Sequence, residues 1–337
     1  MLRNVRSLTF LVVSSVLSLP LSADDARAAK ARDTSVINEH GILWQEPADI
    51  GSRNLYYGPG GEKHQPHGPF TFVEEDLNGT NPKYVVRDQD NVKWTIKLGI
   101  EARPETVATR LVWAAGYFTN EDYYLDEVQV AELPAHVKRG GDLIGHGGAI
   151  HAVRLKRHEE KDIANWQWRD NPFTGTRELN GLKVLMALMN NWDLKDVNNK
   201  VYAVKGSDQQ QYIVSDLGAS FGTNGITIPL SRSKGDLDSY EHSKFMGRIS
   251  PEFVDFRTPV HPSLIYALWP PRYFQRARLD NVLHHIPRDD ARWMGHVLSG
   301  LSPSQIQDAF RAAGYTQAQI DAFSKIVEER ILALNNL

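Results

Sequence analysis

Cysteine is absent from all 337 residues of this chain. The absence excludes disulfide bonds, a thiolate nucleophile, thiolate-bound zinc and a lipid-modified N-terminal cysteine. A chain of this length can still bury enough apolar surface to fold without covalent cross-links. We therefore expect its stability to come from the packing of its core.

Charge of one sign is also not in excess, since the formal net charge is -3 at pH 7. No block of like charge is long enough to predict a disordered interaction tail. A global basic field, which would favour nucleic-acid binding, is missing. We expect no nucleic-acid partner.

The first 28 residues have the three-part layout of a secretory signal peptide. Arg3 and Arg6 precede an apolar run over residues 8–21, and small residues follow. The run is too short for a typical spanning helix, and Ala26-Arg27-Ala28 fits the small-x-small rule for cleavage. We predict export to the periplasm or beyond, with an uncleaved N-terminal anchor as the alternative. No second apolar run is long enough to span a membrane, so we expect no span after signal removal.

Residues 29–69 are polar at first and then dense in Gly, Pro and Asn, which predicts a loop-rich N-terminal extension. Residues 70–160 are predicted to be β-rich, with one helix over residues 104–115. Pro104 is tolerated in the first turn of that helix, and Gly116 is placed to end it. The expected strands cover residues 70–74, 83–88, 92–98, 123–133 and 150–157, with a hairpin turn at 89–91.

Residues 161–337 change in character and are predicted to be mainly helical. Leu179, Leu182, Met186 and Met189 recur at helical spacing. Two short strands are expected near residues 200–204 and 211–214, a helical pattern from residue 265 on, and helices over 306–313 and 320–334. A β-rich part followed by a helical part predicts the α+β fold class.

The most informative residues lie between the predicted apolar helix and the end of the short strand pair. The motif Asp193-Leu194-Lys195-x-x-Asn198 follows the helix, and Asp216-Leu217-Gly218 follows the strands. Each residue has a structural alternative, because Asp and Asn organise turns and Asp before Gly is common in them. In this order and spacing, however, the motifs resemble the catalytic loop and the metal-binding Asp-Phe-Gly of the protein-kinase superfamily.

The resemblance implies ATP-dependent phosphoryl transfer with Mg or Mn, on a two-lobed fold with a β-rich N-lobe (70–160) and a helical C-lobe (161–337). Asp193 would receive the proton of an acceptor hydroxyl, and Lys195 would lie near the transferred phosphoryl group. Asn198 and Asp216 would hold the divalent ion through oxygen ligands.

The same resemblance extends upstream. Lys97 ends a predicted strand, as in the kinase Val-Ala-Ile-Lys motif, and would contact the α- and β-phosphates. Glu105, in the helix that follows, would pair with Lys97, and Glu101 is the competing candidate. A solvated strand-end lysine and a helix-dipole acid are the structural alternatives. No GxGxxG is present, so Gly79, between the first two strands, is the candidate for covering the phosphates.

Other departures place the likeness outside the typical Ser/Thr/Tyr kinases. Asn191-Trp192 stands where His-Arg would precede the catalytic Asp, and there is no Ala-Pro-Glu element. Over residues 70–222 the order of motifs looks more like the persistence-toxin, phosphoinositide and secretory-pathway casein kinase branches. The acceptor could be a protein, a lipid, a sugar or another small molecule.

Two other functions stay open on the sequence. Export favours a non-catalytic binding or scaffold protein that keeps the kinase fold, because ATP is scarce outside the cytoplasm and fold does not imply function. AMP transfer on the same fold is the other. Retention of Lys97, Asp193, Asn198 and Asp216 favours catalysis, since buried charges are costly to keep without a ligand.

Overall fold

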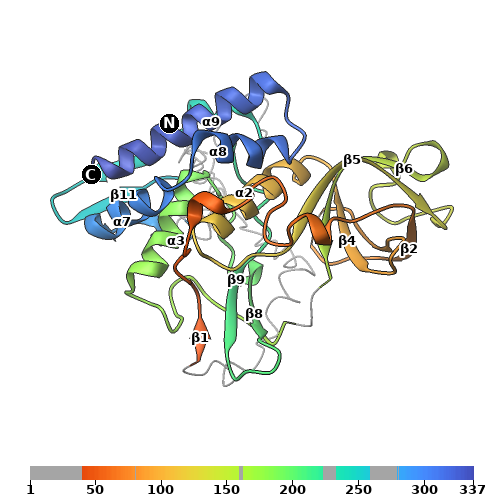
Figure 1. Ribbon diagram of the computed structural model, residues 1–337, viewed down its shortest axis with the longest axis horizontal. Coiled ribbons are helices and arrows are strands. Elements are labelled where there is room, and N and C mark those ends of the chain that lie inside the picture. The colour runs from red at the N-terminus through yellow and green to blue at the C-terminus, as the bar shows by residue number, and fades with distance from the viewer. Residues whose placement is uncertain (1–39, 80, 159–161, 223–232, 259–278, 280) are drawn as a thin grey trace, which may run out of the picture. The chain divides into compact units, whose positions relative to one another are not determined.

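The computed structural model describes residues 40–337, apart from 80, 159–161, 223–232, 259–278 and 280 (Figure 1). The predicted signal peptide lies outside the described residues, and so does the helical pattern expected over 265–278. The described chain is a mixed α+β structure with strand-rich and helical parts. Among its helices, none combines the length and the apolar character needed to cross a membrane.

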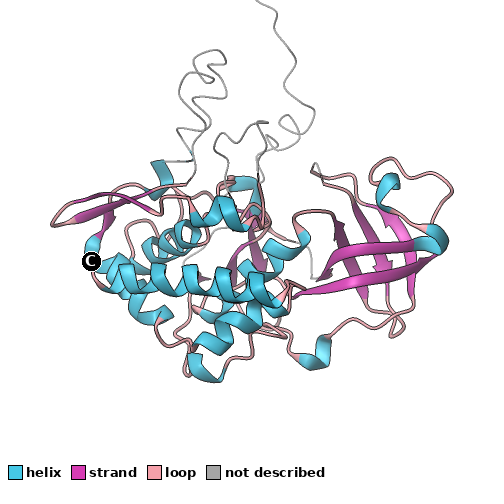
Figure 2. Ribbon diagram, turned by 90° about the horizontal axis from the view of Figure 1, so that it is seen from above, coloured by secondary structure: helices cyan, strands magenta, loops and turns pink. Residues whose placement is uncertain are grey.

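The strands of the first part close into a barrel (Figure 2). They are ordered β2-β3-β4-β6-β5, and a parallel pairing of β2 with β5 completes the circle. The strands predicted from the sequence are present, with small shifts at their ends. Their bounds are β2 (Phe70–Glu75), β3 (Lys83–Arg87), β4 (Lys93–Leu98), β5 (Asp122–Ala131) and β6 (Ala149–Arg157).

Side chains alternate across each barrel strand, so one set fills the interior and the other faces outward. The interior is an apolar cluster that includes Tyr84, Ile96, Val128 and Leu155. Helix α2 (Ala102–Ala114) packs against β5 and β6 from outside. The outward-facing residues under α2 therefore form a separate layer, and the charged groups of the site lie in it.

Helix α2 begins before the predicted start, so Pro104 falls within its first turn, where its missing N–H has no partner to lose. The helix ends before Gly116, which has a φ of 97°. A Cβ at Gly116 would come within 2.4 Å of the backbone oxygen of Gln45. Both the backbone conformation and the space therefore require glycine at this position.

A second sheet has the order β1-β9-β8-β7. Its strand β1 (Gly41–Ile42) belongs to the predicted N-terminal extension and pairs in parallel with β9. The described part of that extension is thus joined to the later chain. The remaining bounds are β7 (Ala164–Asn165), β8 (Asn199–Ala203), β9 (Gln210–Val214), and a third sheet of β10 (Met246–Ile249), β11 (Phe253–Phe256) and β12 (Ile286–Pro287).

In the helical part, α3 (Arg177–Leu188) follows the cap residue Thr176, whose side chain accepts a hydrogen bond from the backbone N–H of Leu179. The predicted stripe on this helix is confirmed, because Leu179, Leu182 and Met186 are fully buried. Capping boxes at Ser302 and Thr316 start the last two helices. The other described helices are α4 (Leu237–Glu241), α7 (Arg288–Leu298), α8 (Pro303–Arg311) and α9 (Gln317–Asn335).

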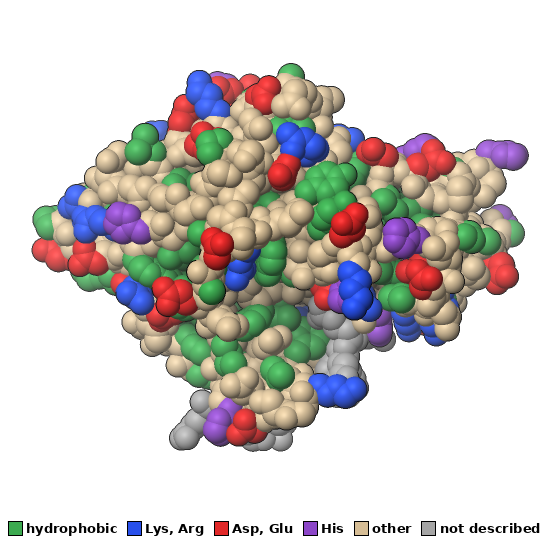
Figure 3. All heavy atoms as spheres, in the orientation of Figure 1, with side chains coloured by type: hydrophobic (Ala, Val, Ile, Leu, Met, Phe, Trp, Pro, Cys, Tyr) green, Lys and Arg blue, Asp and Glu red, His purple; other side chains and the backbone are tan. Residues whose placement is uncertain are grey.

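On the face shown in Figure 3, acidic and basic side chains of the described residues are interspersed rather than gathered by sign.

An aromatic cluster joins α4, α8 and α9 to the chain that follows β9. Phe310 and Phe323 stack with ring centroids 5.1 Å apart and an interplanar angle of 10°. Phe221, five residues after Asp216, packs edge-on against Phe310 and Tyr240, each at 5.3 Å. The segment leaving the site is therefore anchored in the core of the helical part.

Phe323→Ala should lower the free energy of unfolding by about 3–5 kcal/mol, because a fully buried ring leaves a cavity among its partners. Chemical denaturation followed by circular dichroism would measure it. Leu332→Ala, on the same helix but 59% exposed, is the matched control and should change little. Equal losses for the two variants would contradict this account of the core.

Candidate functional site

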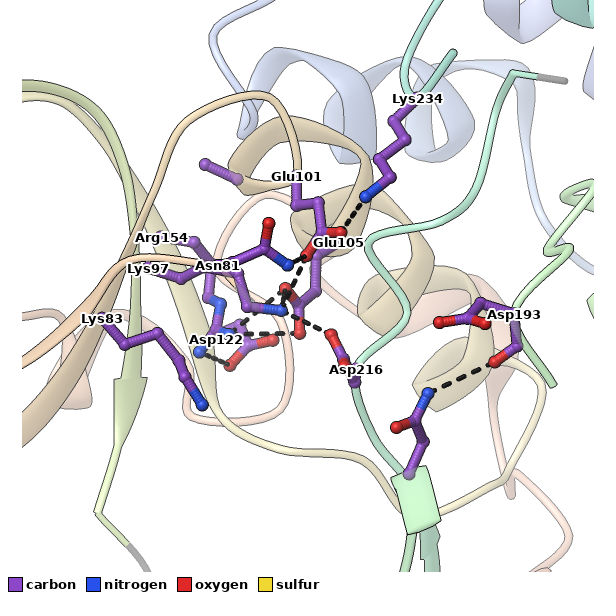
Figure 4. A network of polar contacts seen from close by, with 12 residues as sticks. Asn81, Lys83, Lys97, Glu101, Glu105, Asp122, Arg154, Asp193, Asp216 and Lys234 are labelled. Carbon is purple, nitrogen blue, oxygen red and sulfur yellow. Dashed lines mark hydrogen bonds and ion pairs between the residues drawn. The ribbon is translucent and has the colours of Figure 1, made fainter. Parts of the chain in front are cut away.

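The ammonium of Lys97 lies at the centre of a cluster of carboxylates under α2 (Figure 4). Its Nζ is 2.5 Å from Oδ1 of Asp216, 2.8 Å from Oε2 of Glu105 and 3.1 Å from Oε2 of Glu101. The Lys97 side chain is only 5% exposed. A charge buried this deeply requires ionic partners, and this one has three.

Glu105 contacts a second cation in addition to Lys97. Nη2 of Arg154, on β6, donates to both of its carboxylate oxygens at 3.2 Å. Both side chains are almost completely buried. Glu105 is therefore fixed in position between two cations, Arg154 and Lys97.

Glu101 precedes the first residue of α2 and connects three segments. Its Oε2 accepts from Nδ2 of Asn81 at 2.6 Å, in addition to Lys97. Its Oε1 accepts from Lys234, in the chain that follows Asp216. Both acids considered for Lys97 thus contact it: Glu105 is anchored to the barrel, whereas Glu101 also ties two loops to the site.

Asp216 reaches Lys97 from the end of β9 in an unusual backbone conformation. Its φ is 57°, in the left-handed region that non-glycine residues rarely adopt. Its side chain is 45% exposed, in contrast to Lys97. A Cβ on Gly218 would lie 2.7 Å from Cβ of Glu101, so the backbone after Asp216 approaches α2 as closely as only glycine allows.

Electrostatics keep the cluster ionised. The charge of Lys97 holds the pKa of Asp216 well below its usual range. Burial by itself would lower the pKa of Lys97, but the charges of Asp216, Glu105 and Glu101 raise it well above its ordinary value. Burial likewise opposes ionisation of Glu101, yet Lys97 and Lys234 keep its pKa lowered.

The loop from Asp193 to Asn198 lies on the other side of Asp216 in the view of Figure 4. Nζ of Lys195 is 3.1 Å from Oδ2 of Asp193, and Nδ2 of Asn198 donates to the backbone oxygen of Asp193 at 3.2 Å. The backbone N–H and the hydroxyl of Ser215 both donate to the backbone oxygen of Asn198, at 3.1 and 2.8 Å. Because Ser215 directly precedes Asp216, this pair of bonds fixes the loop relative to Asp216.

The turn between β2 and β3 reaches the same cluster through Asn81. Gly79, in this turn, has a φ of 69°, and its carbonyl accepts from the Arg139 guanidinium. The predicted role of Gly79 toward phosphates stays a prediction.

The structure therefore brings together the predicted residues in two groups joined by Asp216. One group is Lys97, Glu105 and Asp216; the other is Asp193, Lys195 and Asn198. Sequence reasoning missed four further residues that complete the network, Asn81, Asp122, Arg154 and Lys234, and a neighbouring cation, Lys83. Arg154 and Asp122 lie among the outward-facing polar residues of their strands. The sequence does not distinguish them from other such residues, because their place at the site depends on the register between strands.

Two sets of oxygen ligands could bind a divalent ion. Glu101, Glu105 and Asp216 offer oxygens within 4.8 Å of one another, but the Lys97 ammonium already lies among them. The predicted pair, Asp216 and Asn198, is the other set. Lys97 engages one oxygen of the half-exposed Asp216 side chain, and Nδ2 of Asn198 donates to the backbone oxygen of Asp193. Carboxylate and amide oxygens are the donors that Mg and Mn prefer.

Asp122 is a fully buried acid behind the cluster. Its Oδ1 is 3.7 Å from Nη1 of Arg154, and neither carboxylate oxygen has a hydrogen-bond partner in the described structure. Burial raises the pKa of Asp122 from 3.8 to about 6, against the opposing charge of Arg154. Ionising this group inside the protein therefore costs stability.

Replacing Asp122 by Asn should remove a pH-dependent loss of stability. The folded state holds the Asp122 proton up to about pH 6 and the unfolded chain releases it near pH 4, so stability falls as pH rises through that window. Relative to Asp122→Asn, the wild type should lose on the order of 2–3 kcal/mol between about pH 4 and pH 7. Denaturation at a series of pH values measures the difference.

Asp126→Asn, at an exposed position on the same strand, is the control, and its stability curve should follow that of the wild type. Parallel curves for wild type and Asp122→Asn would show that Asp122 has an ordinary pKa.

No protein-family model matches this sequence, and no curated protein matches it. Among solved structures, the chain is similar to the crystal structure of a Helicobacter pylori proinflammatory kinase, CtkA. The two share 12% sequence identity at a TM-score of 0.45, over 80% of this chain and 98% of that chain. A likeness at this level does not establish a shared activity.

Proposed function

We propose that this chain is an ATP- and divalent-metal-dependent phosphotransferase with a two-lobed, protein-kinase-like fold. The barrel and its helix α2 would be one lobe, and the helical part the other. One observation carries the proposal: Lys97, on a barrel strand, contacts Asp216 of the later chain at 2.5 Å while Glu105 holds it from α2. These segments are far apart in sequence, yet the residues that the kinase-like motifs assign to one site contact each other.

In this proposal each residue has a distinct task. Lys97 would bind the α- and β-phosphates, with Glu105 fixing its position. Asp216 and Asn198 would hold a divalent ion, which would neutralise charge on the phosphates. Asp193 would accept the proton of the acceptor hydroxyl. The hydroxyl oxygen would then bond to the γ-phosphorus, while the bond between the γ-phosphorus and the oxygen that bridges it to the β-phosphate breaks and ADP leaves. Lys195, 3.1 Å from Asp193, would orient that carboxylate and lie near the transferred group.

The unusual backbone of Asp216 supports a functional reading of this site. Left-handed conformations at non-glycine residues cost free energy and gather at sites where geometry matters. Ser215 ties the same strand end to the Asp193 loop, so the proposed metal ligand and the proposed base are held by one small set of bonds.

We further propose, from the sequence of residues 1–28 alone, that the protein is exported. The source of ATP would then lie outside the cytoplasm. A non-catalytic protein and an AMP transferase are the two outcomes that the following experiments separate from phosphoryl transfer.

ATP with Mg or Mn should raise the melting temperature of the wild-type protein, and Asp216→Ala should abolish the shift because it removes a metal ligand. Asp193→Asn should keep the shift but lower turnover by about 10²- to 10⁴-fold, the usual worth of a general base. Differential scanning fluorimetry and a product assay would measure the two effects. Asp208→Ala, an exposed loop acid with a side chain 72% exposed, is the control. If no combination of nucleotide and metal raises the melting temperature of the wild-type protein, the proposal is overturned.

Isotope position distinguishes phosphoryl from AMP transfer. With ATP labelled on the γ-phosphate, label should appear on the acceptor or on the protein itself, and α-labelled ATP should give none. Label from the α-position only would refute phosphoryl transfer and establish AMP transfer. Binding without label from either position would favour the non-catalytic function.

A further inference from the structure

Three cations stand in one row across the outer face of the barrel. Lys83 on β3 is directly opposite Lys97 on β4, and Lys97 is directly opposite Arg154 on β6. Directly opposite residues of neighbouring strands project to the same face. Like charges in such positions destabilise a sheet, so a row of three requires compensation or a use.

The three cations of the row differ in how many carboxylates neutralise them. Arg154 and Lys97 are buried and bound by carboxylates, as described above. Lys83 has a side chain that is 20% exposed, and its Nζ is 3.1 Å from Oδ2 of Asp76, which is itself 21% exposed. Lys83 is therefore the solvent-facing end of the row, with one ion-pair partner rather than three.

Lys83 is also the neighbour of Lys97 on the adjacent strand. It extends from β3 beside Lys97 in Figure 4. Because Lys83 is directly opposite Lys97 and Lys97 contacts Asp216, the proposed metal ligand is next to this row of cations.

The turn above Lys83 is braced from the side. The Arg139 guanidinium donates to the backbone oxygens of Gly79 and Asp76, and Glu75 accepts from the backbone N–H of Arg139 at 2.8 Å. A Cβ at Gly79 would lie 4.0 Å from Nζ of Lys83. Lys83 therefore lies beneath a turn that is held in place without a glycine-rich sequence.

The balance of charge between the row of cations and its carboxylates indicates which ligand the site can bind. Three carboxylates share the charge of Lys97, so Lys97 alone does not balance the charge of a polyphosphate. A nucleoside triphosphate carries more negative charge than one divalent ion neutralises. We propose that Lys83 is a phosphate-binding residue of the nucleotide site, which exchanges Asp76 for the β- and γ-phosphates beneath the turn between β2 and β3. The proposal rests on the phosphotransferase function proposed above.

Lys83→Met tests it in the full-length protein. With Mg present, the Kd for ATP should rise about 10- to 100-fold, as expected for loss of a charge-assisted contact to phosphate. The Kd for adenosine should not change, because adenosine has no phosphate. Lys83→Arg, which keeps the charge, should restore most of the affinity. Calorimetric titration with ATP, ADP and adenosine would measure these values.

Lys93→Met is the matched control. Lys93 lies on β4, pairs with an exposed acid, Glu74, at 3.8 Å and stands outside the row. Its replacement should leave ATP affinity unchanged. The melting temperature of unliganded Lys83→Met, which relieves repulsion from Lys97, should equal or exceed that of the wild type.

The outcomes separate the two proposals. A wild-type protein that binds no nucleotide would refute the proposed phosphotransferase function itself. Wild-type binding with an unchanged ATP affinity in Lys83→Met would overturn only the role of Lys83. A Lys83→Met protein that is less stable, yet binds ATP as the wild type does, would show that the lysine serves its ion pair with Asp76.

Discussion

The burial of one ammonium group, that of Lys97, governs the arrangement of the site. A lysine that is 5% exposed cannot stay charged without partners, and three carboxylates from two regions of the chain supply them. Glu105 lies on α2 and Glu101 directly precedes its first residue, whereas Asp216 follows the end of β9. The need to neutralise this group therefore joins the barrel, the helix that covers it and the later chain at one point.

The surrounding structure holds each carboxylate in a different way. Arg154 braces Glu105 within the charged layer between the barrel and α2. Asn81 and Lys234 attach two loops to Glu101. Ser215 links the Asp216 strand to the loop of Asp193 and Asn198. Removing one partner of such a network leaves the others as uncompensated buried charges, so the network behaves as a unit.

Much of the fold could be predicted from periodicity. The barrel strands, α2 and the apolar stripe of α3 follow from alternation, helical spacing and turn residues, which are local properties. Closure of the barrel could not be predicted, because the pairing of β2 with β5 joins residues far apart in the chain. Helix α2 starts before the predicted Pro104, because a proline is equally acceptable inside the first turn. Strand β1 lies in a segment whose Gly, Pro and Asn content predicts loop.

For the candidate site, the amino-acid sequence alone determined the residue types and spacing around Asp193, Asn198 and Asp216, and the placing of Lys97 before a helix with an acid. Those signals are local, and they were enough to suggest phosphoryl-transfer chemistry. Only the tertiary structure decided that both Glu101 and Glu105 contact Lys97, and that Arg154 and Lys83 flank it in one row. Such contacts depend on strand register and on the packing of α2 over the barrel, which no local pattern encodes.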